Sequence, residues 1–74
     1  MGDNNNAFAA QMLHSGKLIR KLRIEKKMSQ LQLAERCYMQ KSSISKLEAG
    51  LSNPTVFTLH KISVVLEVPI NELF

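Results

Sequence analysis

The sequence predicts an all-α fold, a compact bundle of about five short helices. Apolar residues recur three or four positions apart along most of the chain, and no segment alternates apolar and polar residues as a half-buried strand would. Residues that favour helix starts and stops separate these segments at short intervals. With 74 residues, of which 45% are hydrophobic and 22% charged, the chain has the length and composition of one small folded domain.

The first helix is predicted over residues 17–26, where apolar residues share one helix face. Two further apolar residues continue the pattern backward, but Gly16 interrupts it, because glycine weakens a helix interior by about 1 kcal/mol. We therefore expect residues 1–16 to be an N-terminal arm that is partly disordered or extends the first helix. Residues 17–74 are expected to form the folded domain.

The second helix is predicted to begin at Gln30. Ser29 and Gln32 have the spacing of a capping box, in which each side chain bonds the backbone N–H of the other residue. Apolar residues on either side of this box have the spacing of a hydrophobic staple. The helix is expected to end near Tyr38.

The last three elements are predicted from their boundary residues. Gly50 can adopt the left-handed conformation that ends a helix, so the third helix is expected over residues 41–49. Thr55 is the expected N-cap of a fourth helix that ends before Pro69. The closing INELF is expected to form a final short helical turn.

The residues that catalysis or metal binding requires do not occur at suitable spacings. Cys37 is the only cysteine, so neither an intrachain disulfide nor a cysteine-based zinc cluster can form. His14 and His60 are far from Cys37 in sequence, and no nucleophile elbow or oxyanion loop accompanies the serines. We expect no enzymatic activity, no cofactor, no metal and no small-molecule ligand.

The chain is also expected to be cytoplasmic and to make no membrane contact. No apolar run approaches the roughly 18 residues of a membrane span, and the first residues are polar where a secretory signal would be basic.

Positive charge is concentrated in one segment. The net charge is +4 and the isoelectric point is near 9.6. Residues 17–27 hold six basic residues and one acidic residue, whereas residues 51–74 carry a net charge of −1. This asymmetry favours a chain with one face toward a polyanion. A basic helix that is merely solvated is the alternative that charge alone leaves open.

The segment SQLQLAERCYMQKSSISKLEAG has the spacing of a helix-turn-helix: a helix of about eight residues, a tight turn and a second helix. Ala34 is small enough for two steeply crossing helices to approach closely, and Ile44 can close the wedge between them. With IRKLR before it and NPT, LHKIS and INELF after it, this segment resembles the DNA-binding domain of phage repressors and Cro. These domains belong to the xenobiotic-response-element (XRE) family of bacterial transcriptional regulators. The resemblance covers residues 18–74 and implies the lambda-repressor-like fold.

The resemblance implies that the second helix of the motif lies in the major groove of double-stranded DNA. The base-contacting positions carried over are Gln40, Lys41, Ser42, Ser45 and Lys46. Lys41 and Lys46 are the strongest candidates, because lysine donates to guanine O6 and N7 whereas serine pairs with little base preference. The alternative is a polar face that contacts only solvent.

A second set of residues is expected to contact DNA phosphates. Gln30 and Ser43 resemble the phosphate-contacting residues of the family, and the basic Arg20 would attract the duplex. Ser52 and Asn53 supply further donors, although Ser-Asn-Pro is also good turn chemistry.

Two other pairs have expected structural roles. Arg23 and Glu48 resemble a pair that in this family forms a salt bridge between the first and third helices. Leu73 and Phe74 form a large apolar pair, expected either to cover the fourth helix or to contribute to a dimer interface.

Tyr38 departs from the family pattern, in which this position of the turn is commonly glycine. A tyrosine with positive φ would cost about 1 kcal/mol, so either the strain is tolerated or the turn has another shape.

These features together predict a sequence-specific regulator of transcription, a homodimeric repressor that reads a palindromic operator. Two alternatives use the same fold: the antitoxin of a toxin–antitoxin pair, and an adaptor that binds proteins. Double-stranded DNA is the expected partner, with a toxin or an anti-repressor as a further protein partner.

Overall fold

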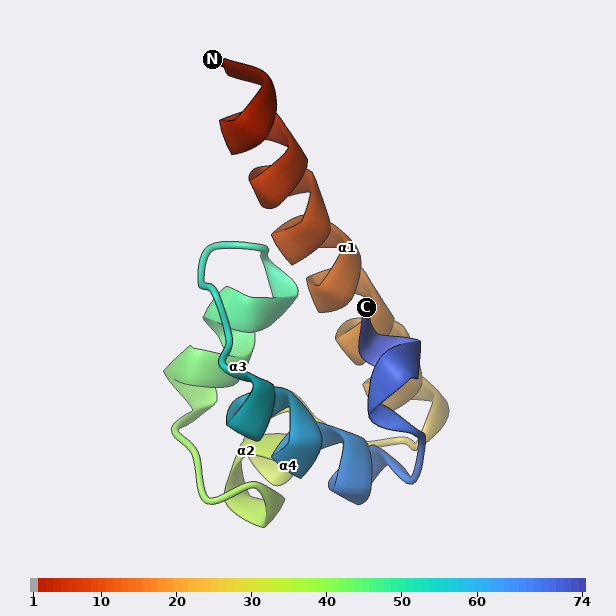
Figure 1. Ribbon diagram of the computed structural model, residues 1–74. Helices are drawn as coiled ribbons and strands as arrows, with labels where there is room; N and C mark the ends of the chain where they lie inside the picture. Colours follow the sequence, from red (N-terminus) through yellow and green to blue (C-terminus); the bar gives the residue numbers. More distant parts are fainter. Residues whose placement is uncertain (1) are drawn as a thin grey trace.

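The computed structural model describes the backbone of residues 2–74 and the side chains of residues 7–74. The predicted all-α architecture is confirmed, but the fifth element is a single 3-10 turn rather than an α-helix (Figure 1). The elements are α1 (Gly2–Glu25), α2 (Gln30–Arg36), α3 (Lys41–Glu48), α4 (Val56–Leu66) and the 3-10 turn η1 (Ile70–Leu73).

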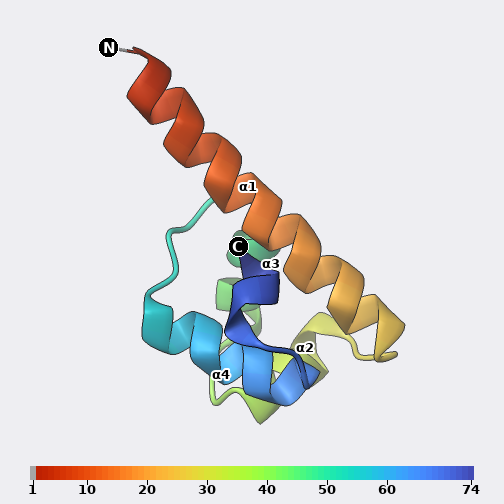
Figure 2. The same cartoon turned by 45° about the vertical axis from the view of Figure 1, so that its right-hand side comes forward.

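α1 is longer than the sequence predicted. It runs without a break from Gly2 to Glu25, so the segment before Lys17 extends the first helix. In Figures 1 and 2 the N-terminal half of α1 projects beyond the other elements. Met1 lies outside the described residues.

Gly16 lies inside α1 because α3 approaches it closely. A Cβ added at Gly16 would lie 2.9 Å from the backbone oxygen of Glu48, and closer still to that of Leu47. The absence of a side chain therefore lets α1 and α3 pack together at this point. Tertiary packing thus overrides the low helix propensity of glycine.

The predicted N-terminal caps are present. The Ser29 hydroxyl accepts a hydrogen bond from the Gln32 backbone, and the Gln32 side chain accepts one from the Ser29 backbone, which together complete the capping box of α2. The Thr55 hydroxyl accepts a bond from the Thr58 backbone at the start of α4. No side chain caps α3, whose N-cap is Gln40.

Each of the four α-helices described above is followed by a residue at positive φ. The backbone N–H groups of this residue and of the next one donate to carbonyl oxygens in the last turn of the helix. Gly50 at the end of α3 has φ 72°, as predicted. The same geometry occurs at Lys27, Tyr38 and Glu67, after α1, α2 and α4. At each of the four sites two backbone bonds form a Schellman motif, for example Met39 N to Ala34 O at 2.8 Å.

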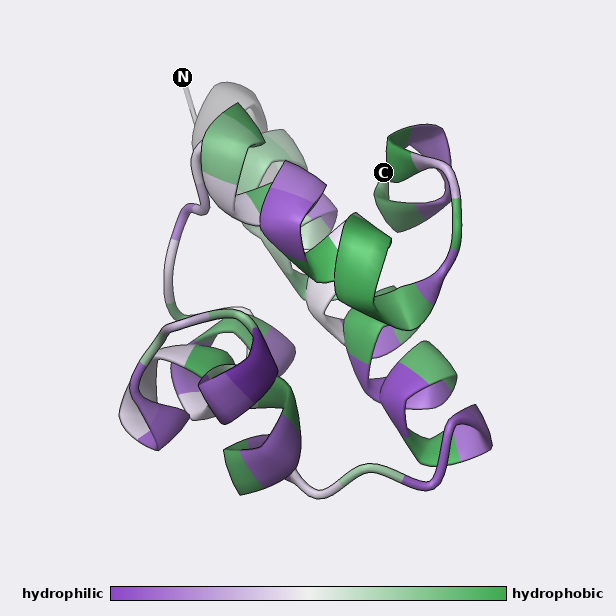
Figure 3. Ribbon diagram, turned by 90° about the horizontal axis from the view of Figure 1, so that it is seen from below, coloured by the Kyte–Doolittle hydropathy of each residue, from purple (hydrophilic) through white to green (hydrophobic). Residues whose placement is uncertain are grey.

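The core lies where the C-terminal half of α1 meets the other elements. Its buried apolar residues are Ile19, Met28, Leu33, Ala34, Cys37, Ile44, Leu47, Leu59, Ile62, Leu66 and Leu73. Figure 3 shows hydrophilic and hydrophobic residues side by side along the helices, as expected when each helix turns one face inward.

Candidate nucleic-acid interface

The interface is built on α2 and α3, which pack closely across a short turn. Ala34 and Ile44 are fully buried where the two helices meet, and so is Leu33. Their burial fixes the direction of α3 relative to the body. The polar side of α3 is thereby turned to solvent.

A buried hydrogen-bond network joins α3 to α1 and to the start of α2. Arg23 Nε and Nη2 donate to the two carboxylate oxygens of Glu48, at 2.6 and 3.0 Å. Arg23 also donates to the backbone oxygen of Met28 at 2.7 Å. The amide nitrogen of Gln30 donates to the same carboxylate at 3.0 Å. The charged partners are 9% and 7% exposed, so water screens this salt bridge weakly.

The environment keeps Arg23 charged. The hydrogen bond and charge of Glu48 raise the pKa of Arg23, and this effect exceeds the lowering caused by burial. The stability that this raised pKa adds is lost as the pH rises through the pKa of Arg23, at strongly alkaline pH.

All five predicted base-contacting residues are exposed at the start of α3 or along it. They are Gln40, Lys41, Ser42, Ser45 and Lys46. The opposite face of the helix carries Ile44, Leu47 and Glu48, all of which are buried. α3 therefore presents one continuous polar face, with lysines toward both of its ends.

A shallow pocket beside α3 brings several predicted residues together. Ser43 and Lys46 of α3 line it with Ser52 and Asn53 of the following loop. Thr58 of α4 lines the same pocket and was not predicted as a site residue. The sequence places Thr58 in a helix, but no local pattern indicates that the start of this helix lies beside the end of α3.

Gln30 occupies a different place from these residues. It is half-buried at the start of α2, and its amide reaches Glu48 rather than the pocket. Apart from Arg20 on α1, the predicted phosphate contacts therefore form two groups: Gln30 at the start of α2, and Ser43, Ser52 and Asn53 at the pocket beside α3. The bond from Gln30 to Glu48 was not predicted, because 18 positions separate the two residues and no local pattern joins them.

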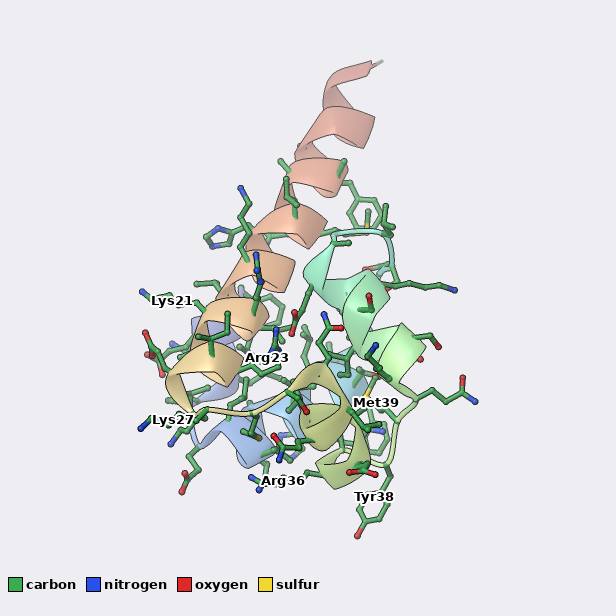
Figure 4. The ribbon with its side chains drawn as sticks, turned by 180° about the vertical axis from the view of Figure 1, so that it is seen from behind. Lys21, Arg23, Lys27, Arg36, Tyr38 and Met39 are labelled. Carbon is green, nitrogen blue, oxygen red and sulfur yellow. The ribbon has the colours of Figure 1, made fainter. Side chains whose placement is uncertain are left out.

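The basic segment of α1 is partly neutralised within the fold. Arg23 is paired with Glu48, and Lys26 forms a surface salt bridge with Glu67 at 2.7 Å. The hydrogen bond and charge of Lys26 lower the pKa of the exposed Glu67 carboxyl. The exposed basic residues that remain in this segment are Lys17, Arg20, Lys21 and Lys27, of which Lys21 and Lys27 are labelled in Figure 4.

The turn between α2 and α3 has the left-handed geometry that glycine favours, with tyrosine in its place. Tyr38 has φ 56°, so the strain is tolerated and the turn keeps its shape. Its side chain is 93% exposed and points away from the body in Figure 4.

The two apolar residues Leu73 and Phe74 lie in different environments, one in the core and one at the surface. Leu73 is fully buried, so of its two expected roles the structure supports covering the core. Phe74 is 52% exposed, and its backbone oxygen lies 3.2 Å from Nε2 of His14.

Cys37 is a core residue. It is buried in the apolar cluster, and this burial raises the pKa of its thiol, although the charge of Lys61 acts in the opposite direction. The thiol is therefore poorly suited to act as a thiolate nucleophile or ligand.

Among the helices that the structure describes, none combines the length and apolar character needed to cross a membrane.

Comparison with known families identifies the fold. The family model described as HTH_3, helix-turn-helix, matches residues 19–73. The chain belongs to this helix-turn-helix family. The match includes α2, the strained turn and α3, and it confirms the resemblance to lambda-repressor-like domains of the XRE type.

The relatives are regulators. The chain is 45% identical over 60 residues to the HTH-type transcriptional regulator SlrR of Bacillus subtilis, covering 80% of this chain and 40% of SlrR. The restriction-modification controller protein C.AhdI of Aeromonas hydrophila has a similar structure, with a TM-score of 0.85 and 29% identity. That match covers 89% of this chain and 96% of C.AhdI.

A third relative was solved with a second protein. In a complex of the SinR and SinI proteins, one chain matches with a TM-score of 0.77 and 38% identity, over 80% of this chain and 58% of that chain. The chain thus spans less than half of SlrR but nearly all of C.AhdI. None of these three is named as an enzyme, in agreement with the expectation from the sequence.

Proposed function

We propose that this protein is a transcriptional repressor that binds a palindromic DNA operator as a homodimer, with α3 in the major groove. The observation that carries the proposal is the continuous polar face of α3, which has candidate phosphate contacts on both sides. Membership of a helix-turn-helix family and the regulatory names of its relatives support it.

The two groups of candidate phosphate contacts would fix the position of α3 on the duplex. Gln30 would hold one backbone, while Ser43, Ser52 and Asn53 would hold the other from the pocket beside α3. One hydrogen of the Gln30 amide is used by Glu48, which leaves the second for a phosphate oxygen. Arg20 on α1 would add a charged contact.

Base recognition would then depend on Lys41 and Lys46. Lys41→Ala should weaken binding to the preferred operator by about 1–3 kcal/mol and relax the preference at one base pair, because a lysine contact to guanine is lost. The measurement is fluorescence anisotropy on the preferred duplex and on duplexes with single base changes.

Lys21→Ala is the matched control, since it removes one exposed lysine that lies on α1 rather than on α3. Equal losses for Lys41→Ala on every duplex would instead make Lys41 a phosphate contact.

A dimer would place two copies of α3 about 34 Å apart, one helical turn of DNA. Phe74 remains the candidate residue of the dimer interface, because it is apolar and half of its surface is exposed. We expect Phe74→Ser to shift the monomer–dimer equilibrium toward monomer in sedimentation velocity, with an unchanged helical spectrum. A dimer of unchanged strength would place the interface elsewhere.

A further inference from the structure

A second groove lies on the outer surface, between the end of α2 and α4. It is lined by Arg36, Cys37 and Tyr38 on one side and by His60, Lys61, Val64 and Val65 on the other. It shares no lining residue with the pocket beside α3. Its volume of about 250 Å³ is below the roughly 300–1,000 Å³ of small-molecule sites. The groove therefore has room for one or two side chains of a larger partner.

Apolar side chains are exposed in and around this groove. Val64 is 61% exposed and Tyr38 is 93% exposed. Phe57, one turn before Lys61 on α4, is 69% exposed. A cluster of large apolar side chains on the surface of a small protein is typical of an interaction site.

Tyr38 also points to a protein interface. Its ring lines the groove and is 93% exposed, so a large side chain stands unpacked at the groove's edge. Tyrosine and arginine are also the side chains enriched at the centres of protein interfaces, and Arg36 lies beside Tyr38 in this groove (Figure 4).

Charge determines which partner fits. Arg36 and Lys61 stand on opposite sides of the groove, and no acidic residue lines it. The ammonium of Lys61 lies 5.2 Å from the ring centre of Phe57, which holds this charge at the apolar cluster. A second copy bound through the same groove would bring like charges together, whereas an acidic segment would be attracted.

We propose that this groove, here called the α2–α4 groove, binds an acidic peptide segment of a partner protein. An apolar side chain of the segment packs against Val64 and Tyr38, and its carboxylates pair with Arg36 and Lys61. The proposal does not depend on DNA binding, since it uses none of the residues assigned to DNA.

The test is a selection of displayed random peptides, each about 15 residues long, on the immobilised 74-residue chain without DNA. Enriched peptides are then synthesised, and their affinity is measured by fluorescence anisotropy at about 150 mM salt. We expect the enriched peptides to be acidic and to contain an aromatic or aliphatic anchor. Val64→Ser should reduce the affinity for these peptides roughly tenfold or more, which is the loss typical of an anchor contact.

Val56→Ser is the matched control, because Val56 is a valine of α4 that is equally exposed, at 68%, but does not line the groove. It should leave the affinity unchanged. Lys61→Glu should weaken the binding of acidic peptides and strengthen the binding of basic ones. Thermal melts of each variant establish that it is folded.

Any of the following results would overturn the proposal: enrichment of no peptide, enrichment of basic peptides, equal effects of Val64→Ser and Val56→Ser, or a change in dimerisation on Val64→Ser that assigns the groove to a second copy. Competition between a selected peptide and any DNA duplex would likewise assign the groove to DNA. A chain that binds an acidic peptide but no specific DNA would keep this proposal and remove the proposed function.

Discussion

Glu48 connects three parts of the interface through one carboxylate. It accepts bonds from Arg23 of α1 and from Gln30 of α2 while belonging to α3 itself. These bonds satisfy a buried charge and hold the amide of Gln30 in a fixed orientation. The same residue therefore stabilises the fold and positions a candidate phosphate contact.

Removing this carboxylate should be costly. Glu48→Ala leaves Arg23 buried without its partner, so we expect a loss of about 3–5 kcal/mol in the free energy of unfolding. Urea denaturation measures it, with Glu35→Ala as the control because Glu35 is exposed on α2. A loss for Glu48→Ala as small as that of the control would show that the pair contributes little.

At Tyr38 we expect a substitution to stabilise the fold, in contrast to Glu48→Ala. Tyr38→Gly should raise the free energy of unfolding by about 1 kcal/mol, because glycine adopts positive φ without a steric penalty. A gain of this size raises the melting temperature by about 4–8 °C in a domain this small. A lower melting temperature would mean that the exposed ring stabilises the fold by contacts that the structure does not indicate.

At the scale of whole elements, the fit of α1 against α3 depends on Gly16. Alanine is the better helix former by about 1 kcal/mol, so propensity alone predicts that Gly16→Ala is stabilising. The added Cβ would meet the backbone of Leu47 and Glu48, which cannot rotate away. We therefore expect a net loss of about 1–3 kcal/mol, measured by urea denaturation.

The matched change is Ala10→Gly, at an exposed position on the projecting part of α1, which should cost no more than about 1 kcal/mol. If Gly16→Ala were stabilising, α1 and α3 could not be as close as the structure places them.

Local chemistry allowed most elements to be predicted. The capping box at Ser29 and the threonine cap at Thr55 fix helix starts through bonds between residues that are three positions apart. The positive φ at Lys27 and Glu67 could not be recognised, because neither residue type favours it and only the folded backbone imposes it. The extension of α1 through Gly16 was obscured for a similar reason, since the cause is a contact with α3.

The site was predictable in part. The polar face of α3 follows from helical spacing and from the family resemblance. The bond between Gln30 and Glu48, the lining of the pocket by Thr58 and the burial of Leu73 depend on tertiary contacts between distant positions.

For the molecule as a whole, the candidate DNA contacts carry little charge. Apart from Arg20, Lys41 and Lys46, the candidate contacts are neutral glutamine, serine and asparagine side chains. With these three cations per subunit at the duplex, a dimer should show a slope of roughly −5 in log K against log salt concentration. Binding titrations at several salt concentrations measure this slope. A slope near −10 would place more of the α1 lysines on phosphates.

We propose that α3 reads DNA sequence as part of a symmetric dimer. Selection of binding sites from a random duplex library at about 150 mM salt tests it most directly, because nonspecific phosphate binding is weak in that condition. We expect enrichment of one palindrome whose half-sites are about 10 base pairs apart, and loss of that enrichment with Lys41→Ala. Failure to enrich any sequence would contradict it.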